Sequence, residues 1–359
     1  MADIPTNVAL VYDRVNKWGG AEQVLLALHE MFPQAPLYTA VSDLRAAPWA
    51  QVFPQVIPSF LNRFPWAKSA HEIYPWLTPL AFEAFDFSAF DAVISVTSAD
   101  AKGIVTKPGT FHLCYCLTPT RYLYSHPVPL LGFLKTWDQI ASRRPDAYLA
   151  ISRTVQSRIK TYYGLDSTVI HPPANIEKFM FNDKWSMVND KYFLSVGRLV
   201  YHKRPDLLIK LFNDLKLPLV IAGTGRMESR LRRMAAPHVR FAGLVSDREL
   251  QQLYRHALGY VSVHEEDFGL VYVEAQAAGL PILALNHGGV GEIVTHGQTG
   301  LLFDDLSDLG QALQAFDLAR FDRPAIAATA ARFSKERFHQ EFAKVFQDLW
   351  TKYKNIYTF

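Results

Sequence analysis

Short apolar runs alternate with helical segments along most of the chain. In the first half, six apolar runs predict buried strands, over residues 7–13, 36–41, 90–96, 111–117, 147–151 and 168–171. Helical segments are expected at 21–31 and 154–163. Short buried strands that alternate with helices form parallel sheets, because a crossover must carry the chain back to the same end of the sheet. The pattern therefore predicts an α/β fold with a Rossmann-like, doubly wound first domain.

The second half repeats this rhythm more regularly. Six further strands are expected, over residues 192–197, 217–222, 239–242, 258–263, 281–285 and 300–303. The helices between them are expected over 204–215, 227–235, 247–256 and 270–279. We expect Asp247 to cap the third of these helices. A last amphipathic segment over 335–357 predicts a terminal helix.

A polar stretch without periodicity, residues 172–190, separates the two halves. We therefore expect one domain over 1–175, a second Rossmann-like domain over 190–335, and a terminal helix over 336–359 that packs back on the first domain. Ligands of doubly wound sheets bind beyond the carboxyl ends of the strands. With two such domains in one chain, we expect the ligand site in a cleft between them.

Composition and charge exclude several classes of protein. Of the 359 residues, 49% are hydrophobic and 20% are charged, which excludes a disordered chain. The net charge of +3 is too small to indicate a nucleic-acid partner. Two cysteines exclude a disulfide scaffold, and we interpret Cys114 and Cys116 as buried thiols, since no second pair completes a zinc site. The chain starts without a secretory signal pattern and has no apolar run that could span a bilayer, so we expect a cytoplasmic protein.

Aromatic residues are concentrated in one part of the first half. Eleven lie between residues 49 and 90: Trp49, Phe53, Phe60, Phe64, Trp66, Tyr74, Trp76, Phe82, Phe85, Phe87 and Phe90. The simpler interpretation is that they pack over the first sheet. The alternative is a surface that meets lipid, because Arg63 and Lys68 stand among the rings as cations do in interfacial segments. In that case residues 60–90 make a peripheral contact with the inner face of the cytoplasmic membrane.

Two acidic residues flank the start of a predicted helix in the second half. Seven residues separate Glu266, on the loop after a strand, from Glu274, about one turn into the helix. Gly269 allows close backbone approach at the helix start, where free N–H groups bind anions or hydroxyls. The two carboxylates would accept hydrogen bonds from sugar or ribose hydroxyls. The alternative is that they only complement the helix dipole.

The loop after the first strand of each half carries a candidate phosphate-binding motif, with cations in the second half and glycines in the first. Arg198 and Lys203 lie after the first strand of the second half, where a planar guanidinium and a point charge can neutralise a pyrophosphate. The alternative is a solvated basic loop. In the first half, Gly19 and Gly20 open a helix and either cradle a phosphate or form only a tight turn. No Asp-x-Asp pair lies near a strand end, so we expect neither a metal nor a cofactor.

Together these motifs resemble glycosyltransferase family 4, which comprises retaining enzymes of the two-domain GT-B fold. The resemblance covers nearly the whole chain. It rests on residues 19–22, 195–198 with Lys203, 222–225, 241–243 and the segment from Glu266 to Glu274. Residues 114–122 also resemble a bacterial mannosyltransferase-like branch that builds O-antigen and exopolysaccharide.

The resemblance implies a role for the motifs of the second half. Arg198 and Lys203 would hold the donor diphosphate and stabilise the departing nucleotide, as a metal does in other transferases. Glu266 and the backbone of Phe268–Leu270 would hold the hydroxyls of the donor sugar, and Glu274 those of the ribose.

The resemblance also implies contacts with the rest of the donor. Gly243 and its neighbours would line the base pocket. In the first domain, Gly19 and Gly20 would let the backbone approach the phosphates.

One position departs from the family pattern. The family usually has a histidine just before Thr-Pro in the first domain, and this chain has Leu117, which can neither hydrogen-bond nor transfer a proton. His112 lies on the same strand at an odd offset, so its side chain is expected on the other face. The resemblance implies that the leaving phosphate takes the acceptor proton, so transfer does not require the histidine.

The sequence therefore predicts a retaining, metal-independent hexosyltransferase that uses a nucleotide-diphosphate sugar. GDP-mannose is the first candidate donor, and a glycan or lipid-linked glycan is the expected acceptor. Two alternatives stay open. One is a UDP-sugar donor bound by the same fold. The other is a binding or scaffold subunit of a glycan assembly complex, which Leu117 keeps open.

Overall fold

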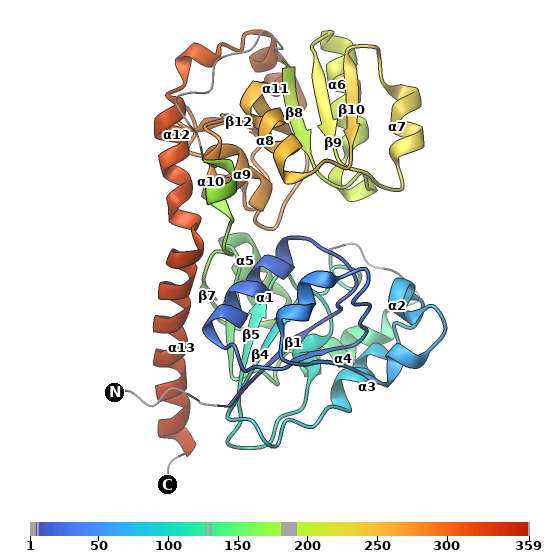
Figure 1. Ribbon diagram of the computed structural model, residues 1–359, viewed down its shortest axis with the longest axis vertical. Coiled ribbons are helices and arrows are strands. Elements are labelled where there is room, and N and C mark those ends of the chain that lie inside the picture. The colour runs from blue at the N-terminus through green and yellow to red at the C-terminus, as the bar shows by residue number, and fades with distance from the viewer. Residues whose placement is uncertain (1–4, 6, 126–127, 129–130, 181–191, 358–359) are drawn as a thin grey trace. The chain divides into compact units, whose positions relative to one another are not determined.

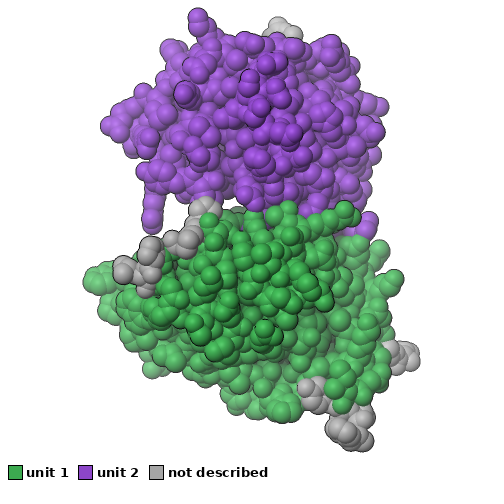
Figure 2. All heavy atoms as spheres, turned by 180° about the vertical axis from the view of Figure 1, so that it is seen from behind, with its two compact units in different colours: residues 1–173, 338–359 green, residues 174–337 purple. Residues whose placement is uncertain are grey.

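The computed structural model describes residues 5, 7–125, 128, 131–180 and 192–357. The chain divides into two compact units, residues 1–173 with 338–359 and residues 174–337 (Figure 2). Ala174 joins the second unit, because its N–H donates to the Phe333 carbonyl at 2.9 Å. Of the connector expected over 172–190, residues 181–190 lie outside the described part of the chain.

The first unit is built on a seven-stranded sheet in which every neighbouring pair is parallel. The strand order is β3-β2-β1-β4-β5-β6-β7. The strands are β1 (Val8–Tyr12), β2 (Leu37–Thr39), β3 (Val56–Pro58), β4 (Ala92–Thr97), β5 (Phe111–Cys116), β6 (Ala147–Ala150) and β7 (Thr168–Val169). Every residue of β1, β4 and β5 is buried, as expected for central strands that are covered on both faces.

Five helices accompany this sheet: α1 (Gly20–Met31), α2 (Ala67–Ala70), α3 (Thr78–Glu83), α4 (Phe133–Ala141) and α5 (Arg153–Tyr163). The terminal helix α13 (Lys335–Tyr357; Figure 1) belongs to the first unit from Phe338 onward. Its aromatic residues recur at helical spacing. Its Phe338 ring packs 6.0 Å from Tyr115, and its Tyr353 ring packs 5.1 Å from Phe111. The helix therefore completes the core over β5.

The aromatic residues of the segment over 49–90 include a buried group and an exposed group, while Trp49, Tyr74, Phe85 and Phe90 are half-buried. Phe53, Phe82 and Phe87 are buried, and the last two pack with Val11 and Val93 of the sheet. The packing interpretation accounts for this first group. A second group on the 3₁₀ turns and short helices between residues 60 and 80 stays exposed to solvent. The sequence pattern predicted none of these short elements.

The second unit has a six-stranded sheet, again parallel throughout, in the order β10-β9-β8-β11-β12-β13. Its strands are β8 (Tyr192–Val196), β9 (Leu219–Ala222), β10 (Val239–Gly243), β11 (Ala257–Ser262), β12 (Ile282–Leu285) and β13 (Gly300–Phe303). Its helices are α6 (Pro205–Leu215), α7 (Glu228–Met234), α8 (Asp247–His256), α9 (Leu270–Ala277), α10 (Val290–Ile293), α11 (Leu306–Gln314) and α12 (Arg323–Thr329). Among the described residues, no helix is long and apolar enough to cross a membrane.

One predicted helix cap is wrong. Asp247 is the first residue of α8, and Ser246 before it is the N-cap. The Ser246 hydroxyl accepts from the Glu249 N–H at 3.3 Å, and the Glu249 carboxylate accepts from the Ser246 N–H at 2.7 Å. This reciprocal capping box leaves the Asp247 carboxylate to pair with Lys178 at 2.7 Å.

Candidate functional site

The candidate site lies where the strand order of the second sheet reverses. β8 and β11 are neighbours, but β9 and β10 lie beyond β8 while β12 and β13 lie beyond β11. Loops that follow such a pair diverge and leave a crevice at the carboxyl ends of the strands. Gly197, Arg198 and Lys203 follow β8, and His264 and Glu266 follow β11. The fold therefore brings residues more than 60 positions apart to one edge of the sheet.

Two glycine-bearing loops hold the Arg198 backbone in place. A Cβ on Gly223 would lie 2.0 Å from the Gly197 carbonyl oxygen, and a Cβ on Gly225 would lie 2.4 Å from that of Leu199. Gly223 also has a φ of +131°, which favours glycine. The loop after β9 can therefore pack directly on the loop after β8 only because both positions lack side chains.

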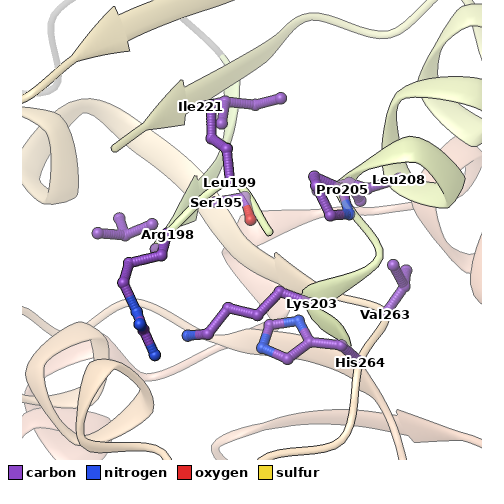
Figure 3. Close-up of a pocket in the computed structure, with 11 residues that line it drawn as sticks. Ser195, Arg198, Leu199, Lys203, Pro205, Leu208, Ile221, Val263 and His264 are labelled. Atoms are coloured by element: carbon purple, nitrogen blue, oxygen red, sulfur yellow. The ribbon is translucent and has the colours of Figure 1, made fainter. Parts of the chain in front are cut away.

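Lys203 and Glu266 form an ion pair in this crevice. Lys203 Nζ lies 2.7 Å from Glu266 Oε1, and the two side chains stay 16% and 20% exposed. Figure 3 shows the Arg198 and Lys203 side chains converging on one pocket, with the His264 ring beside Lys203. The Arg198 side chain is exposed. The crevice thus presents two cations and one carboxylate to solvent.

A chain of hydrogen bonds leads from the core to Glu266. The Tyr272 hydroxyl lies 2.9 Å from Ser262 Oγ, which lies 3.1 Å from His264 Nδ1. His264 Nε2 lies 2.8 Å from Glu266 Oε1. Because an ionised carboxylate only accepts, Nε2 carries the hydrogen and donates it to Glu266. The Glu266 oxygen is therefore held from two sides, by His264 and by Lys203.

The surroundings of Glu266 keep it ionised. Burial by itself would raise the pKa of Glu266, but the Lys203 ammonium and the hydrogen bond from His264 outweigh burial and hold that pKa well below its usual range. Glu266 is therefore a carboxylate at neutral pH, suited to accept hydrogen bonds from hydroxyl groups.

The backbone after Glu266 turns into α9 at Gly269. Gly269 has a φ of +100°, and a Cβ there would lie 2.4 Å from the Tyr272 ring. The Phe268 side chain is buried against Phe333, with the ring centroids 5.3 Å apart. Residues 268–270 therefore offer a ligand mainly their backbone, and the half-buried Leu270 begins the helix.

The other predicted donor residues of this unit lie further along the sheet and α9. Glu274 is half-buried on α9 and accepts from the Tyr254 hydroxyl at 3.4 Å. Burial and the nearby Glu274 raise the pKa of Tyr254 well above its usual range, so this hydroxyl stays protonated. Gly243 ends β10 with a φ of +72°, and its carbonyl accepts from the Gly223 N–H at 2.7 Å.

The remaining residues singled out by the sequence belong to the first unit. Gly19 and Gly20 stand at the start of α1, and their predicted phosphate contact stays a prediction. Leu117 follows β5 and donates its N–H to the Thr97 carbonyl at 2.8 Å. His112 is fully buried, and its Nε2 lies 2.8 Å from Ser95 Oγ. In the described part of the chain, no group of three His, Cys, Asp or Glu residues could hold a metal ion.

Sequence reasoning missed His264 and the two hydroxyls behind it. The signal was available, because Ser262, His264 and Glu266 stand at every second position where β11 ends, and alternate residues of an extended chain lie on one face. Strand alternation thus marks Ser262 and His264, whereas Tyr272 lies on α9 and is not part of this pattern.

Comparisons with known proteins point to glycosyl transfer. Residues 178–312 match the family model of "Glycosyl transferases group 1". The chain is 31% identical over 216 residues to a glycogen synthase of Mycobacterium tuberculosis, which covers 56% of this chain and 51% of that protein. It is 28% identical over 192 residues to a GDP-mannose-dependent alpha-(1-6)-phosphatidylinositol monomannoside mannosyltransferase of the same species, which covers 45% and 49%. The chain thus spans about half the length of the curated relatives it matches.

The likeness to solved structures extends over nearly the whole chain. Anabaena Alr3699/HepE, solved in complex with UDP and glucose, matches with a TM-score of 0.72 at 18% identity, over 95% of this chain and all of that one. The two parallel, Rossmann-like sheets are therefore those of the GT-B fold of glycosyltransferases. The family match lies in the second unit and includes the crevice that holds Arg198, Lys203 and Glu266.

Proposed function

We propose that the protein is a retaining, metal-independent glycosyltransferase. It moves a hexose from a nucleotide-diphosphate sugar, with GDP-mannose as the first candidate, onto a glycan or lipid-linked glycan. The observation that carries the proposal is the meeting of Arg198, Lys203 and Glu266 at the reversal point of the second sheet. This meeting lies inside the segment that matches the group 1 glycosyl transferases.

The two cations suit a diphosphate that leaves with negative charge. Arg198 is exposed and offers a planar fork of N–H donors. The Lys203 ammonium has three N–H donors, so it can keep its hydrogen bond to Glu266 with one and donate another to a phosphate oxygen. Charge that builds up on the departing nucleotide would be stabilised by these groups without a metal.

The carboxylates and backbone suit the rest of the donor. Glu266, fixed by His264, accepts from sugar hydroxyls, and the backbone N–H groups of 268–270 lie beside it along the chain. Glu274 accepts from the ribose hydroxyls, and Gly243 with its open surroundings lines the base pocket. Gly19 and Gly20 of the first unit approach the phosphates.

The transfer step does not need a basic side chain at Leu117. The bond from the anomeric carbon to the diphosphate oxygen breaks, and a bond from that carbon to the acceptor oxygen forms on the same face of the sugar. The acceptor proton passes to the leaving phosphate oxygen. What remains for the protein is to place the reactants and to stabilise the leaving charge.

A UDP-sugar is the second candidate donor. The solved relative from Anabaena is described in complex with UDP and glucose, and its fold covers nearly the whole chain. The mannosyltransferase relative is described as GDP-mannose-dependent. The two candidates differ in the base and the sugar, and both use the same diphosphate contacts.

Thermal unfolding with a panel of GDP-, UDP- and ADP-linked sugars, each with and without EDTA, tests the proposal. A donor at about 100 times its dissociation constant stabilises the folded state by about 2.7 kcal/mol, so the cognate donor raises Tm. We expect the shift with a GDP-sugar, with no effect of EDTA, and a loss of the shift in Glu274→Ala. A shift with UDP-sugars alone selects the second candidate. No shift with any donor would favour a scaffold subunit and overturn the proposal.

A further inference from the structure

We propose that the exposed apolar face over residues 60–80 of the first unit docks on an anionic lipid bilayer. This 60–80 face consists of six large apolar side chains, Phe60, Phe64, Trp66, Ile73, Trp76 and Leu80, with two cations, Arg63 and Lys68. It includes none of the proposed donor residues, and its test needs neither a sugar donor nor an acceptor.

The exposure of this face is high for residues of its type. Trp66 is 75% exposed and Trp76 is 53% exposed, although large aromatic side chains are on average well buried. The rest of the face is also solvent-exposed, while Leu61, Ala67 and Ala81 of the same segment form a buried cluster beneath it. The segment therefore has one side packed on the unit and one apolar side in water.

Contacts within the segment join two of these side chains and fix the turn that carries a third. The Phe60 and Phe64 rings lie 6.2 Å apart, and Phe64 lies 5.5 Å from Tyr74. The Tyr74 hydroxyl donates to the Pro65 carbonyl at 3.0 Å, which ties the turn before Trp66 to the turn before Trp76. Phe60 and Phe64 therefore belong to one structured surface, to which the backbone just before Trp66 is tied.

Trp66 is held outward by a strained backbone. Its φ of +54° and ψ of 0° lie in the left-handed region, which a bulky residue rarely adopts. Its carbonyl accepts from the N–H groups of Ser69 and Ala70 and from the Ser69 hydroxyl, at 2.8–3.2 Å. These bonds maintain the conformation, and strain of this kind is characteristic of functional positions. A fold that needed only a turn here would place glycine or asparagine at this position.

Charge selects an anionic bilayer as the occupant. Arg63 and Lys68 are exposed, and the described residues include no ion-pair partner for either side chain. Glu72 is the one acidic residue between 60 and 80, and its carboxylate lies 3.4 Å from His71. Tryptophan rings are enriched at the lipid headgroups, between the hydrocarbon layer and water. Cations without an ion-pair partner can bind the phosphates of anionic lipids there.

Binding of the full chain to vesicles tests this proposal. The vesicles are phosphatidylcholine alone, or phosphatidylcholine with phosphatidylglycerol, and partitioning is measured by co-sedimentation. We expect binding to the anionic vesicles that weakens with added salt, and quenching of tryptophan fluorescence by brominated lipid. We expect Trp66→Asn with Trp76→Ser to weaken partitioning by about tenfold or more, since two aromatic anchors are lost. Asparagine suits the left-handed backbone at position 66, so the fold is retained.

A matched control removes two apolar side chains from elsewhere on the same unit. Phe133 and Ile140 of α4 are 60% and 59% exposed, so Phe133→Ser with Ile140→Ser removes two apolar side chains of comparable fractional exposure. We expect this variant to bind as the wild type does, and Arg63→Gln with Lys68→Gln to lose the preference for anionic vesicles. Circular dichroism and Tm confirm folding of each variant.

Three outcomes would overturn the proposal. They are no binding by the wild type, equal binding by the tryptophan variant, and equal losses in the tryptophan variant and the α4 control. The first outcome would leave a protein partner as the occupant of the face. None of them affects the test of the proposed function, because the Tm shifts are measured with soluble donors in the absence of lipid.

Discussion

Each sheet reverses its strand order once, and each reversal point has a lysine beside it. In the first unit, Lys102 follows β4, and its ammonium lies 2.5 Å from Asp138 Oδ1 and 3.2 Å from Thr120 Oγ1, with the side chains of the ion pair 2% and 0% exposed. In the second unit, Lys203 follows β8 and shares Glu266 with His264 in an open crevice. An ion pair between a lysine and a carboxylate is therefore enclosed at the first reversal point and partly exposed to solvent at the second.

The neighbouring residues sharpen this difference. At the first reversal point, Asp13 accepts from the Thr97 hydroxyl and from the N–H groups of Ser98, Asp100 and Ala101, at 2.7–3.1 Å. Those donors are thereby occupied by the protein itself. At the second, Arg198 is exposed and faces the pocket. A Lys–carboxylate pair therefore indicates a ligand site only if the pair is exposed and the hydrogen-bond donors around it are not already used by the protein.

The largest effect is expected from breaking the enclosed pair. Burial alone would lower the pKa of Lys102, but the Asp138 and Asp100 carboxylates raise it above its usual range. Lys102→Met leaves Asp138 buried without its cation, and we expect a loss of about 3–5 kcal/mol in the free energy of unfolding. Urea denaturation measures this loss of unfolding free energy. Lys102→Met with Asp138→Leu should recover much of the loss, and a loss below about 1 kcal/mol in the single variant would show that the pair is not structural.

The matched substitution in the second unit should act on activity. Lys203→Met removes a cation from the proposed diphosphate site, and we expect donor hydrolysis or transfer to slow roughly 30- to 900-fold, equivalent to about 2–4 kcal/mol. Steady-state kinetics measure the change. Lys203→Arg keeps the charge and should retain part of the rate. Lys210→Met, on an exposed position of α6, is the control. Full activity in Lys203→Met would refute the role of this lysine.

A smaller effect is expected from the histidine that the first unit encloses. Burial lowers the pKa of His112 to about 3, with Arg144 as a second cause. The unfolded state binds the proton below about pH 6.5 while the folded state does not, so this histidine costs stability as pH falls from about 6.5 toward 3. Between pH 7.5 and 5.5 the wild type should lose about 1 kcal/mol more than His112→Gln. Urea denaturation at the two pH values measures this difference, and equal losses in both proteins would contradict it.

Much of the fold followed from the sequence, and the reason is visible in particular strands. β1 and β9 are short runs of apolar residues, β4 and β5 are largely apolar, and all four are buried throughout, so their pattern alone marks them. β3 is only three residues long and half-buried throughout, and the short helices over 60–83 mix buried and exposed residues without a regular period, so both escaped prediction. The cap of α8 was misplaced by one residue, since Ser246 and Asp247 both suit an N-cap and only the backbone distinguishes them.

The candidate site was predicted in its residue types and only partly in its contacts. Arg198, Lys203 and Glu266 stood out by residue type, and their meeting depends on the pairing of β8 with β11. Strand order is a long-range property that local patterns do not encode, so the ion pair between Lys203 and Glu266 could not be foreseen. His264 was available from strand alternation and was missed.

The terminal helix α13 has a consequence for how the chain folds as it is made. The first unit is assembled from two stretches of sequence, because residues 338–359 join residues 1–173. During translation, Phe111 and Tyr115 of β5 emerge long before Phe338 and Tyr353, the aromatic partners that cover them. The second unit is one continuous stretch, so it can finish folding while the first still has an uncovered apolar face. The domain that is synthesised first is therefore completed last.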